Sequence, residues 1–380
     1  MENAARKIEP KLALSLTIEK NALLGSLSKL QSFVEKRNTI PILSNVKLDA
    51  DQNGLTLTVT DMDLVVSETV EAAVSEEGSL TVPATTLYDI IRKLPEGAQV
   101  KLDLDTKSSR VNIKSGNSKF TLSYLPSDDF PVMSEGTLTH QFSLKSKDFL
   151  KLIEKTRFAM STEETRYYLN GVYFHTVENS LKTVSTDGHR LAKVEIEAPE
   201  GTKGMPGVII PRKAVNEINK ILENQEEVKI SLSDSKIKFN AGKIELLSKV
   251  VDGTFPDYAR VIPENNVKFL TVNSNLVREA IDRVATITAD KTRAVKLNLS
   301  KNNLNISAQG IEGISGNENV ECTYQSDAIE AGFNSRYLLE MLSLVEGVET
   351  NFAFDTANSP VIVTDSKDTS ALFIIMPMRV

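Results

Sequence analysis

Two hydrophobic periods alternate along the chain and predict short strands interleaved with amphipathic helices. Apolar residues at every second position, as at Leu55, Leu57 and Val59, indicate strands with one buried face. Apolar residues spaced by three and four, as at Leu23 and Leu27, indicate helices with one apolar stripe. Turn sequences rich in Gly, Asn and Asp separate the strands. The pattern therefore predicts an α+β fold of antiparallel sheets with helices packed on them.

The same succession of elements occurs three times, with landmarks that recur every 121–128 residues. Each copy is predicted to contain a strand, a helix, three strands, a second helix and three strands. The first helices are predicted over residues 21–34, 148–158 and 276–286. The second helices are predicted after Pro83, after Pro211 and near Asn334. Because this period has the size of a domain, we expect three domains: 1–137, with extra residues 1–13 at its start, then 138–264 and 265–380.

Composition limits the classes of protein that fit. The 41% apolar content of the 380 residues is enough for real cores, and no apolar run approaches the roughly 18 residues of a membrane span. Residues 1–11 have mixed charge and lack the apolar region of a signal peptide. The single cysteine, Cys322, excludes a disulfide framework and a cysteine-based zinc site. Together these features predict a cytoplasmic protein without a membrane partner.

Charge is distributed unevenly between the predicted helices and the rest of the chain. The net charge of −7 taken alone argues against a nucleic-acid binder. The six helix regions nevertheless carry 19 basic and 12 acidic residues, out of 44 and 51 in the chain. These regions are residues 17–37, 84–94, 144–158, 212–224, 273–293 and 334–346. Two interpretations remain open: solvated helix faces, or helices lining a surface that faces phosphates.

The clearest example of helix charge lies in the second copy. Lys147, Lys151 and Lys155 follow one another at intervals of four residues and form a basic stripe opposite the apolar face. We expect this stripe to contact DNA phosphates if the helices line such a surface.

Signals for catalysis are weak. The phosphate-binding loop motif is absent, and Gly310, Gly313 and Gly316 have the wrong spacing for a dinucleotide fingerprint. The three histidines form no metal-ligand pair with one another or with the cysteine. Asp187 and His189 are conceivable as the acid–base pair of a hydrolase, but a turn after a strand is the favoured interpretation. No catalytic residue, metal or cofactor is therefore predicted.

Four motifs together carry a family resemblance: Arg-Tyr-Tyr-Leu-Asn-Gly at 166–171, Thr-Asp-Gly-His-Arg-Leu at 186–191, Val-Asp-Gly-Thr-Phe-Pro-Asp-Tyr at 251–258 and Met-Pro-Met-Arg at 376–379. With them, residues 14–380 resemble the bacterial sliding clamps, the beta subunits of DNA polymerase III. The resemblance implies a non-enzymatic processivity factor. It also implies a head-to-tail homodimer, in which six domains close a ring around double-stranded DNA with the helices inside.

The resemblance implies partners as well. Besides DNA and a second copy of the chain, these are the catalytic subunit of DNA polymerase III, the clamp loader, and other polymerases and repair proteins that bind through short peptides. A tandem protein-interaction scaffold without DNA is kept as an alternative to both the clamp and the hydrolase.

Site residues follow from the same resemblance. Those implied to contact DNA are Arg37, Tyr167 and Tyr168, in addition to the lysine stripe. Those implied at the dimer contact are Phe120 and Leu122 at one end, and Thr286 and Ile287 at the other. Those implied to form a protein-binding cleft between the second and third domains are Leu169, Thr186, Gly188, His189, Arg190, Leu191, Pro256, Arg260, Val261, Asn334, Tyr337, Pro360, Ile374, Met376, Pro377, Met378 and Arg379.

Overall fold

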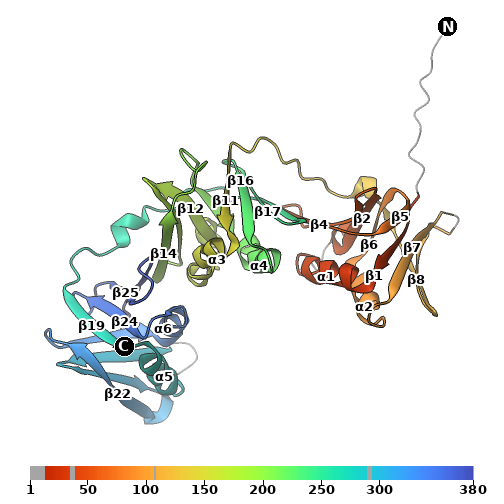
Figure 1. Cartoon of the computed structure of the whole chain (residues 1–380). Helices are drawn as coiled ribbons and strands as arrows, with labels where there is room; N and C mark the ends of the chain where they lie inside the picture. The colour runs from red at the N-terminus through yellow and green to blue at the C-terminus, as the bar shows by residue number, and fades with distance from the viewer. Residues whose placement is uncertain (1–12, 35–38, 107, 289–292, 380) are drawn as a thin grey trace, which may run out of the picture. The chain divides into compact units, whose positions relative to one another are not determined.

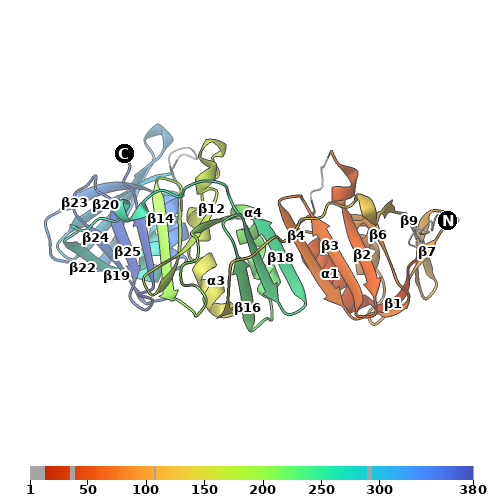
Figure 2. The ribbon, with the colours of Figure 1, turned by 90° about the horizontal axis from the view of Figure 1, so that it is seen from above.

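The computed structural model describes residues 13–34, 39–106, 108–288 and 293–379, which form two compact units (Figures 1 and 2). The first unit comprises Met1–Ser146 and Glu217–Lys249, and the second Lys147–Asn216 and Val250–Val380. The middle repeat is thus divided between the units, and helix α4 (Arg212–Leu222) runs from one range into the other.

The first unit holds two antiparallel sheets. Its strands are β1 (Ser15–Glu19), β2 (Asn45–Asp51), β3 (Gly54–Thr60), β4 (Leu64–Val70), β5 (Ala73–Glu76), β6 (Gly78–Pro83), β7 (Gln99–Asp105), β8 (Arg110–Ser115), β9 (Ser118–Ser123), β10 (Leu125–Pro126), β11 (His140–Lys145), β16 (Glu227–Leu232), β17 (Lys236–Ala241) and β18 (Ile244–Lys249). They are ordered β5-β1-β7-β8-β9 and β10-β6-β2-β3-β4-β18-β17-β16-β11. The helical segments are α1 (Lys20–Leu30), α2 (Ala84–Arg92), η1 (Pro41–Ser44) and η2 (Ser127–Asp129).

The second unit contains one long antiparallel sheet of twelve strands. The strands are β12 (Gly171–Val177), β13 (Ser180–Thr186), β14 (Arg190–Glu197), β15 (Val208–Pro211), β19 (Lys268–Asn273), β20 (Ala294–Ser300), β21 (Asn303–Gln309), β22 (Ser315–Tyr324), β23 (Ile329–Asn334), β24 (Glu349–Phe354), β25 (Val361–Asp365) and β26 (Ala371–Ile375). Their order is β15-β12-β13-β14-β26-β25-β24-β19-β22-β21-β20-β23. The helical segments are α3 (Ser146–Glu154), α5 (Ser274–Ala285), α6 (Ser335–Leu342), η3 (Arg157–Ala159), η4 (Glu164–Leu169), η5 (Tyr258–Val261) and η6 (Ile311–Gly313).

The predicted hydrophobic faces are confirmed. Leu55, Leu57 and Val59 of β3 are almost completely buried, as are Leu23 and Leu27 of α1. Helix α1 packs on α2 and on β1, β3 and β4, and α5 packs on α6 and on β19 to β22. Helices therefore cover the apolar face of the sheets, and burial of that face supplies the main stabilisation of each domain.

Sheets continue from one repeat into the next. In the first unit β4 of the first repeat pairs with β18 of the middle repeat, and Val66 lies opposite Leu246. In the second unit β14 of the middle repeat pairs with β26 of the third, and Leu191 lies opposite Ile374. The middle repeat thus joins its neighbours through backbone hydrogen bonds rather than through side chains alone.

The prediction of three strands between the first and second helix of each copy is wrong. The second copy has four, because β15 precedes α4 directly, and the third has four, because β23 precedes α6. In the first copy both β5 and β6 precede α2. Residues 208–210 of β15 are all buried apolar residues, so they lack the alternation on which the strand predictions depended.

Gly171 of β12 offers a test of the pairing between β12 and β15. A Cβ atom there would lie 2.2 Å from the carbonyl oxygen of Ile210, whereas a Cβ atom on Gly25 in α1 would meet nothing within 4 Å. We expect Gly171→Ala to lower the free energy of unfolding by about 2 kcal/mol through overpacking. Gly25→Ala should raise it by roughly 0.5–1 kcal/mol through helix propensity. Urea unfolding of both variants measures the difference, and equal effects would contradict it.

Candidate functional site

An apolar hollow in the second unit lies where β14 meets β26. Its volume is about 290 Å³. It is lined by Arg166, Tyr168, Leu169, Thr186, Gly188, Arg190, Leu191, Pro256, Tyr258, Val261, Ile374 and Met376. We call this hollow the cleft. Nine of the predicted cleft residues are among those that line it.

The floor of the cleft is a small hydrophobic cluster. Leu169, Leu191 and Ile374 are buried there together with Val184 and Phe255. Leu169 ends η4, Leu191 is the second residue of β14 and Ile374 lies in β26, so three separate segments meet at this point. An apolar floor open at the surface is suited to receive apolar side chains of a partner.

The turn between β13 and β14 forms one side of the cleft and explains Asp187. Its Oδ1 accepts hydrogen bonds from the backbone N–H groups of His189, at 2.9 Å, and Arg190, at 3.0 Å. Gly188 has φ +89, a backbone conformation that glycine adopts without strain. Asp187 therefore orders a turn, which disfavours the hydrolase interpretation.

The corresponding turn of the first repeat has the same construction. Asp61 Oδ1 accepts hydrogen bonds from the N–H groups of Asp63, at 3.0 Å, and Leu64, at 2.8 Å. In both turns the preceding threonine, Thr60 or Thr186, donates its hydroxyl to the carbonyl oxygen of the residue four positions on. The repetition shows that the aspartate belongs to the architecture of the domain.

Arg190 is a buried cation beneath the cleft. It pairs with Asp187 at 3.1 Å and with Glu340 of α6, and its guanidinium lies 4.2 Å from the centre of the Tyr337 ring. These contacts tie β14 of the middle repeat to α6 of the third. Burial alone would raise the pKa of Glu340, but hydrogen bonds from Arg190 and Arg336 outweigh it and lower the pKa.

Other predicted cleft residues lie outside the lining. Asn334 caps α6, because its Oδ1 accepts from the N–H groups of Arg336 and Tyr337. Exposed Arg260 pairs with Asp257 at 2.8 Å. The carbonyl oxygen of Pro360 accepts a hydrogen bond from Asn266 at 2.9 Å. The remaining residues of this group are His189, Tyr337, Pro377, Met378 and Arg379. Their part in binding remains a prediction.

The segment after β26 makes backbone hydrogen bonds first to the turn before β14 and then to β23. The Met376 N–H donates to the carbonyl of His189, and the Met378 N–H to that of Gly332 in β23, both at 2.8 Å. Strand β26 has already ended at Ile375, and both methionines are half-buried. Flexible, polarizable methionine side chains at the rim suit a site that receives more than one partner.

Three lining residues are missing from the predicted cleft set. Arg166 and Tyr258 stand at the ends of the motifs at 166–171 and 251–258. A third, Tyr168, is predicted to contact DNA, but its half-buried ring packs against the cleft cluster. A signal for all three was present, since each belongs to a quoted motif, but it does not tell which side chain faces the hollow.

The basic stripe on α3 needs a correction. Lys155 is only 5% exposed and lies 2.6 Å from Asp368 and 2.8 Å from Glu346. Lys151 also pairs with Asp368, at 2.8 Å. Lys147 is exposed and forms no ion pair within the described part of the chain. The stripe is thus a buried ion cluster joining α3 to the loop before β26, and Lys147 alone keeps an exposed, unpaired charge.

The remaining predicted positions are on the surface, apart from Arg37, which lies outside the described residues. Tyr167 is 53% exposed, with its ring centre 5.8 Å from that of Tyr168. Phe120 is exposed and Leu122 half-buried, both on β9. After α5, Thr286 is exposed and Ile287 half-buried. Their contacts with DNA or with a second copy remain predictions.

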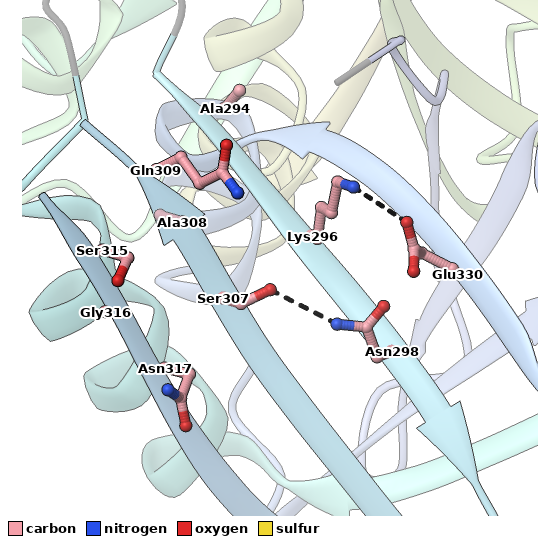
Figure 3. Close-up of a pocket in the computed structure, with 10 residues that line it drawn as sticks. All are labelled: Ala294, Lys296, Asn298, Ser307, Ala308, Gln309, Ser315, Gly316, Asn317 and Glu330. Atoms are coloured by element: carbon pink, nitrogen blue, oxygen red, sulfur yellow. Dashed lines mark hydrogen bonds and ion pairs between the residues drawn. The ribbon is translucent and has the colours of Figure 1, made fainter. Parts of the chain in front are cut away.

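A second hollow, of about 330 Å³, lies on the partly exposed face of β20 to β23 (Figure 3). Two pairs of its polar groups bind one another: Lys296 pairs with Glu330 at 2.8 Å, and the Asn298 amide donates to Ser307 Oγ at 3.3 Å. It lacks the predominantly apolar lining typical of a ligand pocket. The residues that the model describes contain neither a cluster of metal-ligating side chains nor a helix capable of crossing a membrane.

The repeated α+β domains, with shared sheets and an apolar cleft, define a three-domain clamp fold. In order along the chain, family models for the N-terminal, central and C-terminal domains of the DNA polymerase III beta subunit match residues 14–134, 143–257 and 259–379. The chain belongs to this family.

Individual relatives are similar over nearly the whole chain. The beta sliding clamp of Caulobacter vibrioides is 45% identical, and that of Rickettsia felis 40%; each comparison covers 97% of this chain and all of the relative. A solved Caulobacter crescentus beta sliding clamp has a TM-score of 0.95 at 45% identity. A sliding clamp from Bartonella birtlesii, solved bound to griselimycin, has a TM-score of 0.94 at 44% identity. Both structures cover 97% of this chain and are themselves covered completely.

The buried ion cluster generates a stability prediction. Asp368→Asn should lower the free energy of unfolding by about 3 kcal/mol, because it leaves the buried Lys155 ammonium without its nearest carboxylate. Lys147→Met changes an exposed, unpaired lysine on the same helix and should alter it by less than about 0.5 kcal/mol. Urea unfolding at pH 7 compares the two, and equal small effects would contradict the prediction.

We also predict that the stability difference between wild type and Asp368→Asn depends on pH. Burial alone would raise the pKa of Asp368, but hydrogen bonds from Lys151, Lys155 and Ser370 outweigh it and lower the pKa well below its usual range. A lowered folded-state pKa stabilises the fold above the unfolded pKa of about 4, and this stabilisation is lost as the pH falls further. The stability gap between wild type and Asp368→Asn should therefore be constant from pH 7 to 5 and narrow below pH 4.

Proposed function

We propose that this protein is a sliding clamp: a non-catalytic processivity factor that encircles duplex DNA and tethers the replicative polymerase. The observation that carries the proposal is the match to three clamp domains in order along the whole chain, with a TM-score of 0.95 to a solved clamp. A cytoplasmic location follows from such a role in bacterial replication.

Two strand edges support head-to-tail closure by a second copy. Strand β9 ends its sheet, and residues 315–321 of β22 pair on one side only within the described chain. The β9 edge carries exposed Lys119 and Phe120, and the β22 edge carries exposed Glu321, together with Glu318, which pairs with Arg283 at 2.7 Å. Unpaired edges of opposite charge at different ends of a chain favour a heterologous contact, and two such contacts can close a ring.

The distribution of exposed charge in the second unit suits DNA binding without sequence preference. Exposed Lys147 and Tyr167 are the proposed contacts to DNA in the second unit, and neither position offers a pattern that reads base edges. Because several other helix lysines are paired with carboxylates, the phosphate contacts are expected to be few and weak. Encirclement rather than affinity would then keep the protein on DNA.

The cleft is the proposed tether for partners. An apolar floor of buried leucine and isoleucine side chains, rimmed by Arg166 and Met376, fits a short peptide with apolar anchor residues. The proposed ligands are short segments of the polymerase catalytic subunit, the clamp loader, and other polymerases and repair proteins.

Retention on DNA of different topology tests the proposal. After loading by a clamp loader, the protein should stay on nicked circular DNA through gel filtration and be lost once the circle is linearised. A protein that binds both forms equally would be an ordinary DNA binder. A protein that binds neither would be a protein scaffold, and either result would reject the clamp.

Two exposed valines of the connector between the second and third repeats allow a matched test of the cleft. Val261 is 45% exposed and lines the cleft, whereas Val267 is 68% exposed and does not. Val261→Asp should weaken binding of a fluorescein-labelled polymerase peptide at least tenfold, because a carboxylate is desolvated in an apolar site. Val267→Asp should bind as wild type does. Fluorescence anisotropy measures both, and equal affinities would argue against the cleft.

A charge at the proposed dimer contact should open the ring. Phe120→Asp is expected to raise the dimer dissociation constant at least a hundredfold, since an exposed apolar side chain that the proposed contact would bury becomes an unpaired carboxylate. Val132→Asp, at a more exposed position of the same unit, should have no effect. Analytical ultracentrifugation across a concentration series measures both, and a wild-type constant for Phe120→Asp would place the interface elsewhere.

A further inference from the structure

One wall of the cleft comes from the connector, residues 250–267, which contains neither a strand nor an α-helix. Pro256, Tyr258 and Val261 line the cleft from this segment, and the single turn of η5 is its sole helical element. A wall without regular backbone pairing takes its position largely from side-chain contacts with the sheet beneath it.

Three stacked rings anchor the beginning of this wall. The ring of Phe255 lies 4.9 Å from that of Tyr173, at 7° between the planes. Tyr173 in turn lies 4.2 Å from His175, at 16°. Tyr173 and His175 are two residues apart on β12 and so share one face of the sheet. The stack therefore fastens the connector to that strand.

A hydrogen bond anchors the wall three residues further along. His175 Nε2 and Tyr258 Oη are 2.9 Å apart, and the rings meet edge to face at 5.5 Å. His175 is buried, and its ring makes a side-chain hydrogen bond with Tyr258. The bond thus connects a side chain beneath the cleft with one that lines it.

Both groups are neutral at physiological pH. Burial, with a smaller contribution from Lys182, lowers the pKa of His175 to about 4. Burial also raises the pKa of Tyr258 to about 12. One neutral donor and one neutral acceptor therefore face each other, and the bond persists throughout the pH range in which the protein works.

We propose that His175 is a positioning residue for peptide binding, which fixes the connector wall of the cleft through Tyr258 and the aromatic stack without itself lining the cleft. This inference rests on the proposed function of the cleft. Without the bond, the hydroxyl of half-buried Tyr258 would lose its partner inside the protein, and the turn that presents Val261 would lose one of its anchors.

Substitutions at His175 separate the hydrogen bond from the stack. His175→Phe keeps a ring against Tyr173 but cannot bond to Tyr258, and should weaken peptide binding about tenfold. His175→Gln places an amide near the position of Nε2 and should restore the affinity to within about threefold of wild type. The probe is the fluorescein-labelled polymerase peptide, measured by anisotropy at pH 7.5 with the full-length dimer.

A double-mutant cycle tests whether His175 acts through Tyr258. Tyr258→Phe alone removes the hydroxyl and should also weaken binding. The variant carrying both Phe substitutions should bind more tightly than the product of the two single losses predicts, because the bond can be lost only once. His140→Phe, at a half-buried histidine on β11 in the other unit, should leave the affinity unchanged.

The outcomes are distinguishable. Equal affinity of wild type and His175→Phe would overturn the inference while leaving the cleft intact. Equal loss in His175→Phe and His175→Gln, or strict additivity with Tyr258→Phe, would overturn the role of the hydrogen bond. Failure of the wild-type protein to bind the peptide would reject the proposed function and the inference with it. Retention on circular DNA should be unchanged in every variant.

Discussion

The pairing of β14 with β26 is the interaction on which the candidate site depends. It joins the second repeat to the third through backbone hydrogen bonds, and its register places Leu191 directly opposite Ile374. The floor of the cleft is therefore set by strand register. A slip of one residue would turn the side chains of one strand to the other face of the sheet. Arg190, paired with Glu340, and the cluster around Asp368 then secure the third repeat to the same strand and to α3.

Shared sheets also explain why the repeats are organised as they are. A single copy would leave the edges of β4, β14, β18 and β26 unpaired, and such edges invite association with other chains. Pairing β4 with β18, and β14 with β26, removes these edges within each unit. The edges of β9 and of the first part of β22 remain, and these are the ones through which we propose that the ring closes. Intrachain and interchain assembly would thus use the same chemistry.

Sequence patterns identified the helices, strands and turns that are determined by residues close together in the sequence. Alternating apolar residues located β3, and spacings of three and four located α1, because each pattern reports which face of one element is buried. The turn at Asp187 was also predictable, since the Asx-type contacts that order it lie within three residues. Strand β15 was not, because its continuous apolar run has no alternation. For the site, the motifs named most of the cleft but not which of their side chains face it.

What the sequence by itself determined is the threefold repeat and the α+β class, since both are periodic along the chain. The segments that contribute to the cleft were named through the family resemblance of four contiguous motifs. What only the tertiary structure decided are contacts between residues far apart in sequence. Lys155 has the spacing of a solvent-facing helix residue, yet Asp368, more than two hundred residues away, buries it. His175 has no distinguishing local pattern, and its link to Tyr258 exists because the connector folds back over β12. Local patterns report the face of an element, whereas the partner on that face is chosen by the packing of the whole unit.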